Sequence, residues 1–347
     1  MMPKVLFLVL FLFFFVFNAG FRFPFFSPKS FPIINFSVSD CSDYQRVEDK
    51  IFLDPVCVLN GRLPNFSLKD RADIVWTRIL SFSKGYDSQT ETILYRPAEI
   101  ALSKADNLYP LTEKRRQQLV LAHQKGEKIW FPLSFFASLV VPNLAFYISE
   151  KDISQLKPCT KHNYLLAFET LDGKLIKAGS DFSFNRHLFG LRGYCQGNAG
   201  LDLKFYWGVC GAASQLFRAS LTNPLLEIPK RWGHNDWYSA YYGKKVQGDD
   251  ASVYETSKQL IIKNASASDV VIKTFQQGDK TYLVLVTDKK SVQNKRVEIQ
   301  KVYLGSLQVK LFREVYQKSL VSGKKVIKSL KSEFFFSKYL SINSESR

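Results

Sequence analysis

The feature that most constrains the fold is a predicted amphipathic helix followed by a series of short apolar strands. Apolar side chains recur at helical spacing from Val209 to Leu221, and Asn223-Pro224 ends the pattern. The strands are short apolar or alternating runs between turn-forming residues, at 260–263, 270–275, 282–287 and 297–304. This order predicts an α+β fold, in which the helix that carries Cys210 packs on an antiparallel sheet formed by residues 250–305.

The part of the chain before this helix predicts a mixed region of helices and strands. Helical spacing indicates helices at 70–81 and 112–125. The apolar stretch 129–147 is interrupted by prolines and serines, which favours a buried helix or a strand pair. Residues 164–170 are interpreted as a strand that ends at the turn Asp172-Gly173.

The N-terminus predicts export. Lys4 precedes Val5–Phe17, an unbroken run of thirteen apolar residues. A short basic start before such a run is typical of a secretory leader. Because Phe17 occupies a position where cleavage needs a small residue, the run is interpreted either as a signal peptide or as a retained membrane anchor, at residues 1–26. The Phe-, Pro- and Ser-rich segment that follows, 27–40, predicts a spacer.

Five cysteines in an exported chain predict pairs and one free thiol. Cys41 with Cys57 and Cys159 with Cys195 is one partition, which leaves Cys210 unpaired, although sequence alone does not fix the connectivity. Because the chain has no CxxC and no Cys/His cluster with zinc spacing, we expect no metal and no cofactor.

The net charge of +17 predicts polyanionic surroundings, such as anionic lipid, envelope polymer or nucleic acid. Nucleic acid ranks last, because no zinc-finger, RNA-recognition or dense basic-helix pattern is present. Residues 306–347 carry nine basic and three acidic side chains. They predict a basic hairpin or tail, which is either a solvated surface or an electrostatic contact with polymer or lipid.

Five motifs follow one another between Gly179 and Tyr254. They are Gly179-Ser180-Asp181-Phe182-Ser183-Phe184-Asn185, Gly193-Tyr194, Gly208-Val209-Cys210, Lys230-Arg231 with His234, and Gly248-Asp249-Asp250-Ala251-Ser252-Val253-Tyr254. In order and spacing this series resembles the VanW-like family over roughly residues 173–305. The chain departs from that pattern in having Tyr206-Trp207 before Gly208 and Gly211 after Cys210.

The resemblance implies an extracytoplasmic protein of the bacterial cell envelope, and it implies no particular activity. It gives the expected organisation of the chain: 1–26 leader or anchor, 27–40 spacer, 41–160 mixed region, 161–305 VanW-like domain, and 306–347 basic hairpin or tail.

Cys210 is the strongest candidate for chemistry, because it stands in the first turn of the predicted helix between Gly208 and Gly211. The positive end of a helix dipole favours a thiolate, and the N–H groups of Cys210 and its neighbour can stabilise an oxyanion. His234 is the expected base and Asp249 or Asp250 the group that orients it, an order similar to that of papain-like and transglutaminase-like enzymes. His187 is a second candidate base.

Two further interpretations of the same residues remain open. Cys210 is equally consistent with a structural role in a non-catalytic wall-binding or accessory module, or in a purely structural anchor. Ligand contacts are expected from Trp207, Trp232 and Tyr242, whose rings can stack on sugars, and from Arg231, which can bind a carboxylate. The expected partners are a wall or envelope polymer and, through the N-terminal segment, a membrane.

Overall fold

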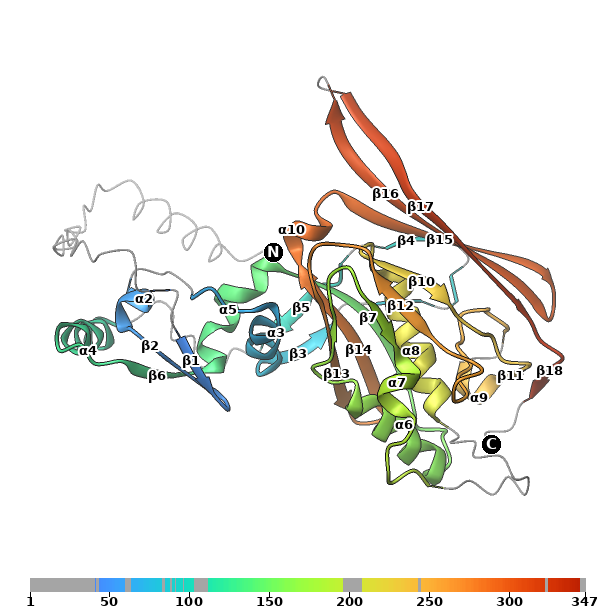
Figure 1. The fold of residues 1–347 in the computed structure, drawn as a ribbon, viewed down its shortest axis with the longest axis horizontal. Helices are drawn as coiled ribbons and strands as arrows, with labels where there is room; N and C mark the ends of the chain where they lie inside the picture. The colour runs from blue at the N-terminus through green and yellow to red at the C-terminus, as the bar shows by residue number, and fades with distance from the viewer. Residues whose placement is uncertain are drawn as a thin grey trace, which may run out of the picture. The chain divides into compact units, whose positions relative to one another are not determined.

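The computed structural model describes residues 41, 44–59, 64–82, 85–87, 89–90, 92–95, 97–102, 112–195, 208–242, 245–321 and 324–343. Residues 41–347 form one compact unit (Figure 1). The expected leader and spacer at 1–40 lie outside the described residues. Within the described part of the chain, no helix combines the length and the apolar character needed to cross a membrane.

The central sheet is antiparallel and has the strand order β7-β14-β13-β8. It is formed by β7 (Leu144–Asp152), β14 (Lys280–Asp288), β13 (Val270–Gln277) and β8 (Leu175–Ile176). The middle of β14, Leu283–Val286, is fully buried, as expected for a strand that is covered on both faces.

Helix α8 (Val209–Thr222) packs against β7 and β14 of this sheet and against α6 (Pro158–Thr170). A buried glutamine fixes the helix to the strands: Gln215 Nε2 donates to the carbonyls of Ser149, at 2.8 Å, and Thr281, at 2.9 Å. The Tyr164 hydroxyl of α6 donates to the Gln215 side-chain oxygen. Because both polar atoms of the buried Gln215 side chain have partners, this residue fixes the register of the helix on the sheet.

The described residues after 175 form three further sheets. One of these sheets also contains strand β4, which comes from the preceding region. In β17-β16-β15-β4 and β10-β12-β9 all neighbours are antiparallel, whereas β11 and β18 are parallel. The strands are β4 (Thr92–Tyr95), β9 (Asp181–Ser183), β10 (Leu226–Lys230), β11 (Asp236–Tyr238), β12 (Ile261–Asn264), β15 (Lys295–Gly305), β16 (Gln308–Val321), β17 (Lys324–Lys338) and β18 (Ser341–Asn343).

The N-terminal region has two small antiparallel sheets, β1-β2-β6 and β3-β5. Its strands are β1 (Tyr44–Val47), β2 (Lys50–Leu53), β3 (Ile79–Phe82), β5 (Ile100–Leu102) and β6 (Ile129–Pro132). Ser67 and Thr112 cap α3 and α4 through their side-chain oxygens. The remaining helices of the described chain are α2 (Pro55–Leu59), α3 (Leu68–Trp76), α4 (Glu113–Gln124), η2 (Leu133–Phe136), α5 (Ala137–Val140), η3 (Val141–Asn143), α7 (Phe184–Leu188), α9 (Ser239–Tyr242) and α10 (Lys289–Val292).

The mixture of helices and antiparallel sheets confirms the predicted α+β class. The strand prediction for 164–170 is wrong, because these residues end α6. Pro158 begins this helix at its first turn, where a missing N–H costs nothing. Tyr164, Ala167 and Phe168 are buried at the helical spacing of three and four residues.

The predicted sheet of residues 250–305 needs a second correction. Strands β13 and β14 pair as expected, but the edge strand β7 comes from residues 144–152. Strand β12 pairs with β9 and β10, and β15 pairs with β4 and β16. Local patterns identify strands, whereas their partners depend on which apolar faces meet in the tertiary structure.

The disulfide partition is confirmed. Cys41 pairs with Cys57, and Cys159 pairs with Cys195, with Cα atoms 5.4 and 5.5 Å apart. Cys210 is the free cysteine. The second disulfide joins the first turn of α6 to the Gly193-Tyr194 motif, beside the helix on which α8 packs.

Candidate active site

Cys210 is the second residue of α8, directly after a glycine that the packing requires. Gly208 caps the helix with φ 104°, and a Cβ atom on it would lie 2.2 Å from the Thr160 carbonyl oxygen of α6. No other residue type fits that position. The close approach of α6 therefore sets where α8 begins, and it places the half-buried Cys210 thiol at the positive end of the helix.

His234 is held by a single carboxylate oxygen. The Oδ2 atom of Asp250 accepts both the His234 backbone N–H, at 2.8 Å, and the ring Nδ1, at 2.5 Å. The Cys210 thiol lies close enough to the same imidazole for each group to shift the pKa of the other, while its sulfur contacts the Val253 carbonyl at 3.5 Å. The side chains of Cys210, His234 and Asp250 thus form a series in which the thiol is electrostatically coupled to an imidazole that is hydrogen-bonded to a carboxylate.

The charges of this series favour a thiolate and an imidazolium. Burial opposes the charged form of Cys210, but the hydrogen bond to His234 and the imidazolium charge outweigh it, so the pKa of the thiol is lowered. Burial also opposes the imidazolium, yet the hydrogen bonds to Asp250 and Cys210 raise the pKa of His234 to about 9. The Val253 N–H adds a donor 3.4 Å from the Cys210 sulfur. At neutral pH these shifts favour the ion pair.

Asp250 is fully buried, and its other oxygen has its own partners. Oδ1 accepts from Arg231 Nη2, at 2.7 Å, and from the Tyr339 hydroxyl, at 2.5 Å. Burial would raise the pKa of this carboxyl, but the Arg231 charge and the hydrogen bond with His234 hold it well below its usual range. Asp250 is therefore a permanent anion behind the imidazole. We call Cys210, His234, Asp250, Arg231 and Tyr339 the thiol cluster.

Asp249, the other candidate carboxylate, turns away from His234. It pairs with Arg218 at 2.8 Å and accepts from the Tyr86 hydroxyl at 2.9 Å, with Lys301 Nζ at 3.5 Å. The sequence left Asp249 and Asp250 as alternatives, and only Asp250 contacts the imidazole in the structure. Consecutive residues of an extended segment point in opposite directions, which separates their roles.

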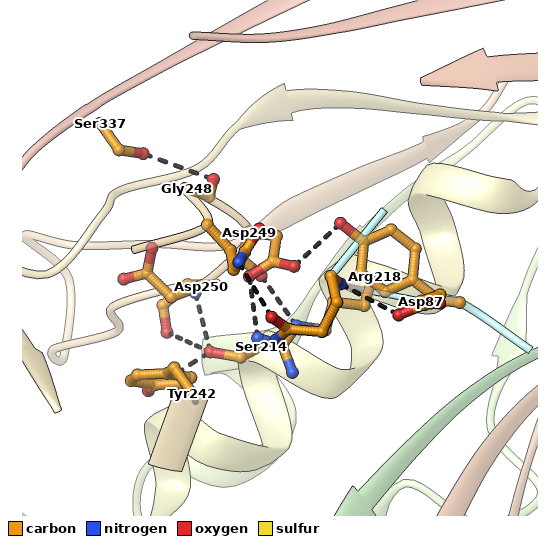
Figure 2. Close-up of polar contacts among 12 residues, drawn as sticks. Asp87, Ser214, Arg218, Tyr242, Gly248, Asp249, Asp250 and Ser337 are labelled. Atoms are coloured by element: carbon orange, nitrogen blue, oxygen red, sulfur yellow. Dashed lines mark hydrogen bonds and ion pairs between the residues drawn. The ribbon is translucent and has the colours of Figure 1, made fainter. Parts of the chain in front are cut away.

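The segment 249–253 lies along α8, and three side chains of the helix contact it at intervals of four residues; Figure 2 shows two of them, Ser214 and Arg218, beside Asp249 and Asp250. Arg218 binds Asp249, Ser214 Oγ accepts the Ala251 N–H at 2.8 Å, and Cys210 contacts Val253. Four helical residues rise about 6 Å, close to the length of two extended residues. The spacings therefore match, and Asp250, between the bound residues, is turned toward His234.

Ser214, Arg218 and Tyr339 are site residues that the motifs did not single out. The first two are buried polar side chains on a largely apolar helix, one and two turns after Cys210. Their spacing of four residues was a usable signal, because a polar row within an apolar stripe needs buried partners. Tyr339 lies 89 residues after Asp250, and no local pattern could have connected the two.

The expected ligand residues lie in different surroundings. Arg231 has a side chain only 2% exposed, and its charge is paired with Asp250. Tyr242 is buried beside the His234 ring, with centroids 5.4 Å apart. Trp232 is 45% exposed, two residues from His234. Trp207 lies outside the described residues. Among these four, Trp232 is the one with an exposed side chain.

The structure also shows the contacts of His187, the alternative base, and of the backbone N–H groups expected to bind an oxyanion. His187 stacks on Phe182, with ring centroids 4.5 Å apart. The Gly211 N–H, expected as a donor to an oxyanion, donates to the Gly208 carbonyl at 2.8 Å. The Cys210 N–H belongs to the first helical turn, which lacks carbonyl partners within the helix. Within the described residues no three His, Cys, Asp or Glu side chains are placed to hold a metal ion.

Residues 160–286 match the model of the family described as VanW like protein. This segment is VanW-like. The match confirms the resemblance predicted from the five motifs, and it includes Cys210, His234 and Asp250. Tyr86, Lys301 and Tyr339 lie outside the VanW-like segment, although each contacts one of its two buried aspartates. No curated protein and no solved structure matches the chain.

Proposed function

We propose that the VanW-like segment is a thiol hydrolase or transferase of the bacterial cell envelope that acts on amide bonds of peptidoglycan or another envelope polymer. Cys210 is the nucleophile, His234 the general base and acid, and Asp250 the carboxylate that orients the imidazole. The observation that carries this proposal is the series of a thiol electrostatically coupled to His234 and a His234 ring hydrogen-bonded to the buried Asp250 carboxylate. Three groups with these roles are what nucleophilic thiol catalysis requires.

The chemistry follows from the two charges of the resting pair. The Cys210 thiolate attacks the amide carbon, and a carbon–sulfur bond forms while the carbonyl oxygen becomes an oxyanion near the start of α8. When this intermediate collapses, the carbon–nitrogen bond breaks and the amine leaves with a proton from His234. Water or an acceptor amine then attacks the thioester, gives its proton to His234 and regenerates the thiolate.

The position of Asp250 supports this sequence of proton transfers. Its Oδ2 holds both the backbone and the ring of His234, so the imidazole keeps its orientation while the other ring nitrogen exchanges a proton with sulfur, substrate and water. Because Arg231 and Tyr339 hold the same carboxylate, Asp250 remains ionised throughout the cycle.

Several observations support an extracytoplasmic location and a wall substrate. Two disulfides suit an oxidising compartment, and the apolar run Val5–Phe17 suits export. The exposed Trp232 ring, two residues before His234 in the sequence, suits sugar or peptide ligands.

Incubation of the full-length protein with purified peptidoglycan tests the activity. We expect new free amino groups from hydrolysis, or incorporation of a labelled amine from transfer, and complete loss of either in Cys210→Ala and His234→Ala. Ser220→Ala is a control on the same helix, because its buried hydroxyl has no hydrogen-bond partner among the described residues. Unchanged product release by Cys210→Ala would refute the proposal.

A second measurement separates catalysis from plain binding. We expect iodoacetamide to label Cys210 rapidly at neutral pH and to label His234→Ala far more slowly. If the thiol were inert and the protein bound wall material in a way that Trp232→Ala abolished and Cys210→Ala preserved, a non-catalytic wall-binding module would be the better description.

A further inference from the structure

A second region of the molecule gathers positive charge without matching negative charge. It is a cavity of about 760 Å³ bounded by residues of α3, the η3 turn, α10 and the strands β15 and β16. Six cationic side chains line it, namely Arg71, Lys289, Lys290, Lys295, Arg296 and Lys318. We call the cavity that these six residues line the basic cavity. Its one acidic lining residue is Asp288.

The single carboxylate is already engaged. Asp288 Oδ1 lies 2.5 Å from Arg71 Nη1, so one of the six positive charges is paired within the lining. The other five line the same cavity, and like charges gathered around one cavity repel one another. A bound anion would remove that repulsion, and the walls of a cavity focus the positive potential that attracts it.

Two guanidinium groups of the cavity have buried donors without partners. In the described part of the chain, the Nε atoms of Arg71 and Arg296 are buried and make no hydrogen bond. An unsatisfied buried donor costs about 1–3 kcal/mol, so a ligand whose oxygens accepted from these two groups would regain part of that energy. Arg296 is held from the other side by the Tyr316 ring, whose centroid lies 5.4 Å from its Cζ.

The arrangement of the cations suits a ligand with several charges. Arg71, Lys295 and Arg296 are half-buried, whereas Lys289, Lys290 and Lys318 are exposed. Burial lowers the pKa of Lys295, which is the expected effect on an ammonium that lacks a close carboxylate. An anion bound by the half-buried cations would leave the exposed lysines free to bind further charges of the same chain.

We propose that the basic cavity binds a phosphate-bearing oligomer, such as a segment of a polymer linked by phosphodiesters. Guanidinium groups bind phosphate oxygens with paired donors, and the lysines add point charges. The volume is within the range of sites for small ligands, and Pro64, Phe66, Pro97 and Pro142 supply apolar surface for the uncharged part of each repeat. This binding goes beyond the thiol chemistry and does not depend on it.

Calorimetric titration of the full-length protein with tripolyphosphate and with short polyglycerol phosphate, in about 150 mM salt, tests the proposal. We expect both to bind, and we expect Arg71→Gln/Arg296→Gln to weaken binding by more than about tenfold, as the loss of charged hydrogen bonds implies. Arg115→Gln/Arg116→Gln is the matched control. It removes the same two charges from exposed positions on α4, outside the cavity, and should change affinity by less than about twofold.

A second variant and a second polymer separate loss of phosphate binding from misfolding and from general charge attraction. Lys289→Gln/Lys290→Gln changes only exposed lysines, so a loss of affinity in that variant cannot come from misfolding. Polygalacturonate carries carboxylates in place of phosphates and should bind more weakly, whereas Cys210→Ala should bind like the parent protein. Absence of phosphate binding, equal loss in the α4 control, or equal affinity for polygalacturonate would overturn the proposal.

Discussion

The thiol cluster and the basic cavity differ in how many of their charged side chains have a partner of opposite charge. In the thiol cluster every charge has a partner: Asp250 binds Arg231, His234 and Tyr339, and His234 binds the thiol. In the basic cavity six cations share one carboxylate, and two buried Nε donors have no partner within the described residues. Side chains whose charges are all paired are held in one geometry, which a catalytic group needs. Charged side chains without partners can instead gain interaction energy when a ligand of opposite charge binds.

Replacing Asp250 by Asn should have the largest effect on stability. It removes the carboxylate that pairs with the buried Arg231, and breaking a buried pair in this way costs about 3–5 kcal/mol. Denaturant unfolding measures the cost. Asp288→Asn is the matched change in the basic cavity, where the carboxylate is 31% exposed and the loss should stay below about 1 kcal/mol. Equal losses would contradict the contrast between the two regions.

The next largest effect should be the pH dependence of the free energy of unfolding that comes from His234 in the thiol cluster. Because the pKa of His234 is raised from 6.5 to about 9, the imidazolium stabilises the folded protein. That contribution is fully present below about pH 6.5 and is lost as the pH rises through about 9. Unfolding of the parent and His234→Gln proteins at several pH values measures it. The difference between the two should shrink toward high pH, and a difference that grew would contradict the raised pKa.

Ser214→Ala tests the match between α8 and the segment 249–253. The change leaves the buried Ala251 N–H without its acceptor, at a cost of about 1–3 kcal/mol, and it should slow alkylation of Cys210. Ser220→Ala on the same helix is the control, because its buried hydroxyl has no partner in the described chain and its removal should be neutral or stabilising. Similar behaviour of the two variants would refute this role of Ser214.

Tyr339→Phe should lower the free energy of unfolding by a smaller amount. It should also change the reactivity of Cys210, because Tyr339 binds Asp250 and Asp250 binds His234. Because Arg231 and His234 still hold Asp250, the loss should not exceed about 1.5 kcal/mol, the lower end for a hydrogen bond to a charged group. The rate of alkylation as a function of pH should shift to higher pH. Tyr147→Phe, in β7, removes a buried hydroxyl outside the thiol cluster and should leave that profile unchanged.

The smallest effect is expected from Lys318→Gln in the basic cavity. Removing one of several like charges should leave unfolding within about 0.5 kcal/mol of the parent protein, with any change toward greater stability. Thermal unfolding at low salt measures it, since repulsion between the exposed cations is largest there. A clear destabilisation would mean that the charge of Lys318 is paired in the folded protein.

Local patterns in the sequence predicted the elements that their own residues decide. The apolar stripe and the Asn223-Pro224 stop placed α8, and apolar runs between turns placed β13 and β14. The strand prediction for 164–170 is wrong because the short apolar run belongs to a helix that begins earlier, at Pro158, a residue that favours the first turn of a helix. In the candidate site, the position at a predicted helix start singled out Cys210, and motif order singled out His234 and left Asp249 and Asp250 as alternatives.

The sequence by itself determined that a thiol stands between glycines at a helix start, that one cysteine of five is left unpaired, and that the chain is strongly basic. Only the tertiary structure decided that Asp250 rather than Asp249 contacts His234, that Tyr339 completes the carboxylate, and that Arg71 and Arg296 share a cavity. The physical reason is distance along the chain. Helical and extended periods are local, whereas the partners of a buried charge are whichever groups the packing of helices and sheets brings within hydrogen-bonding reach.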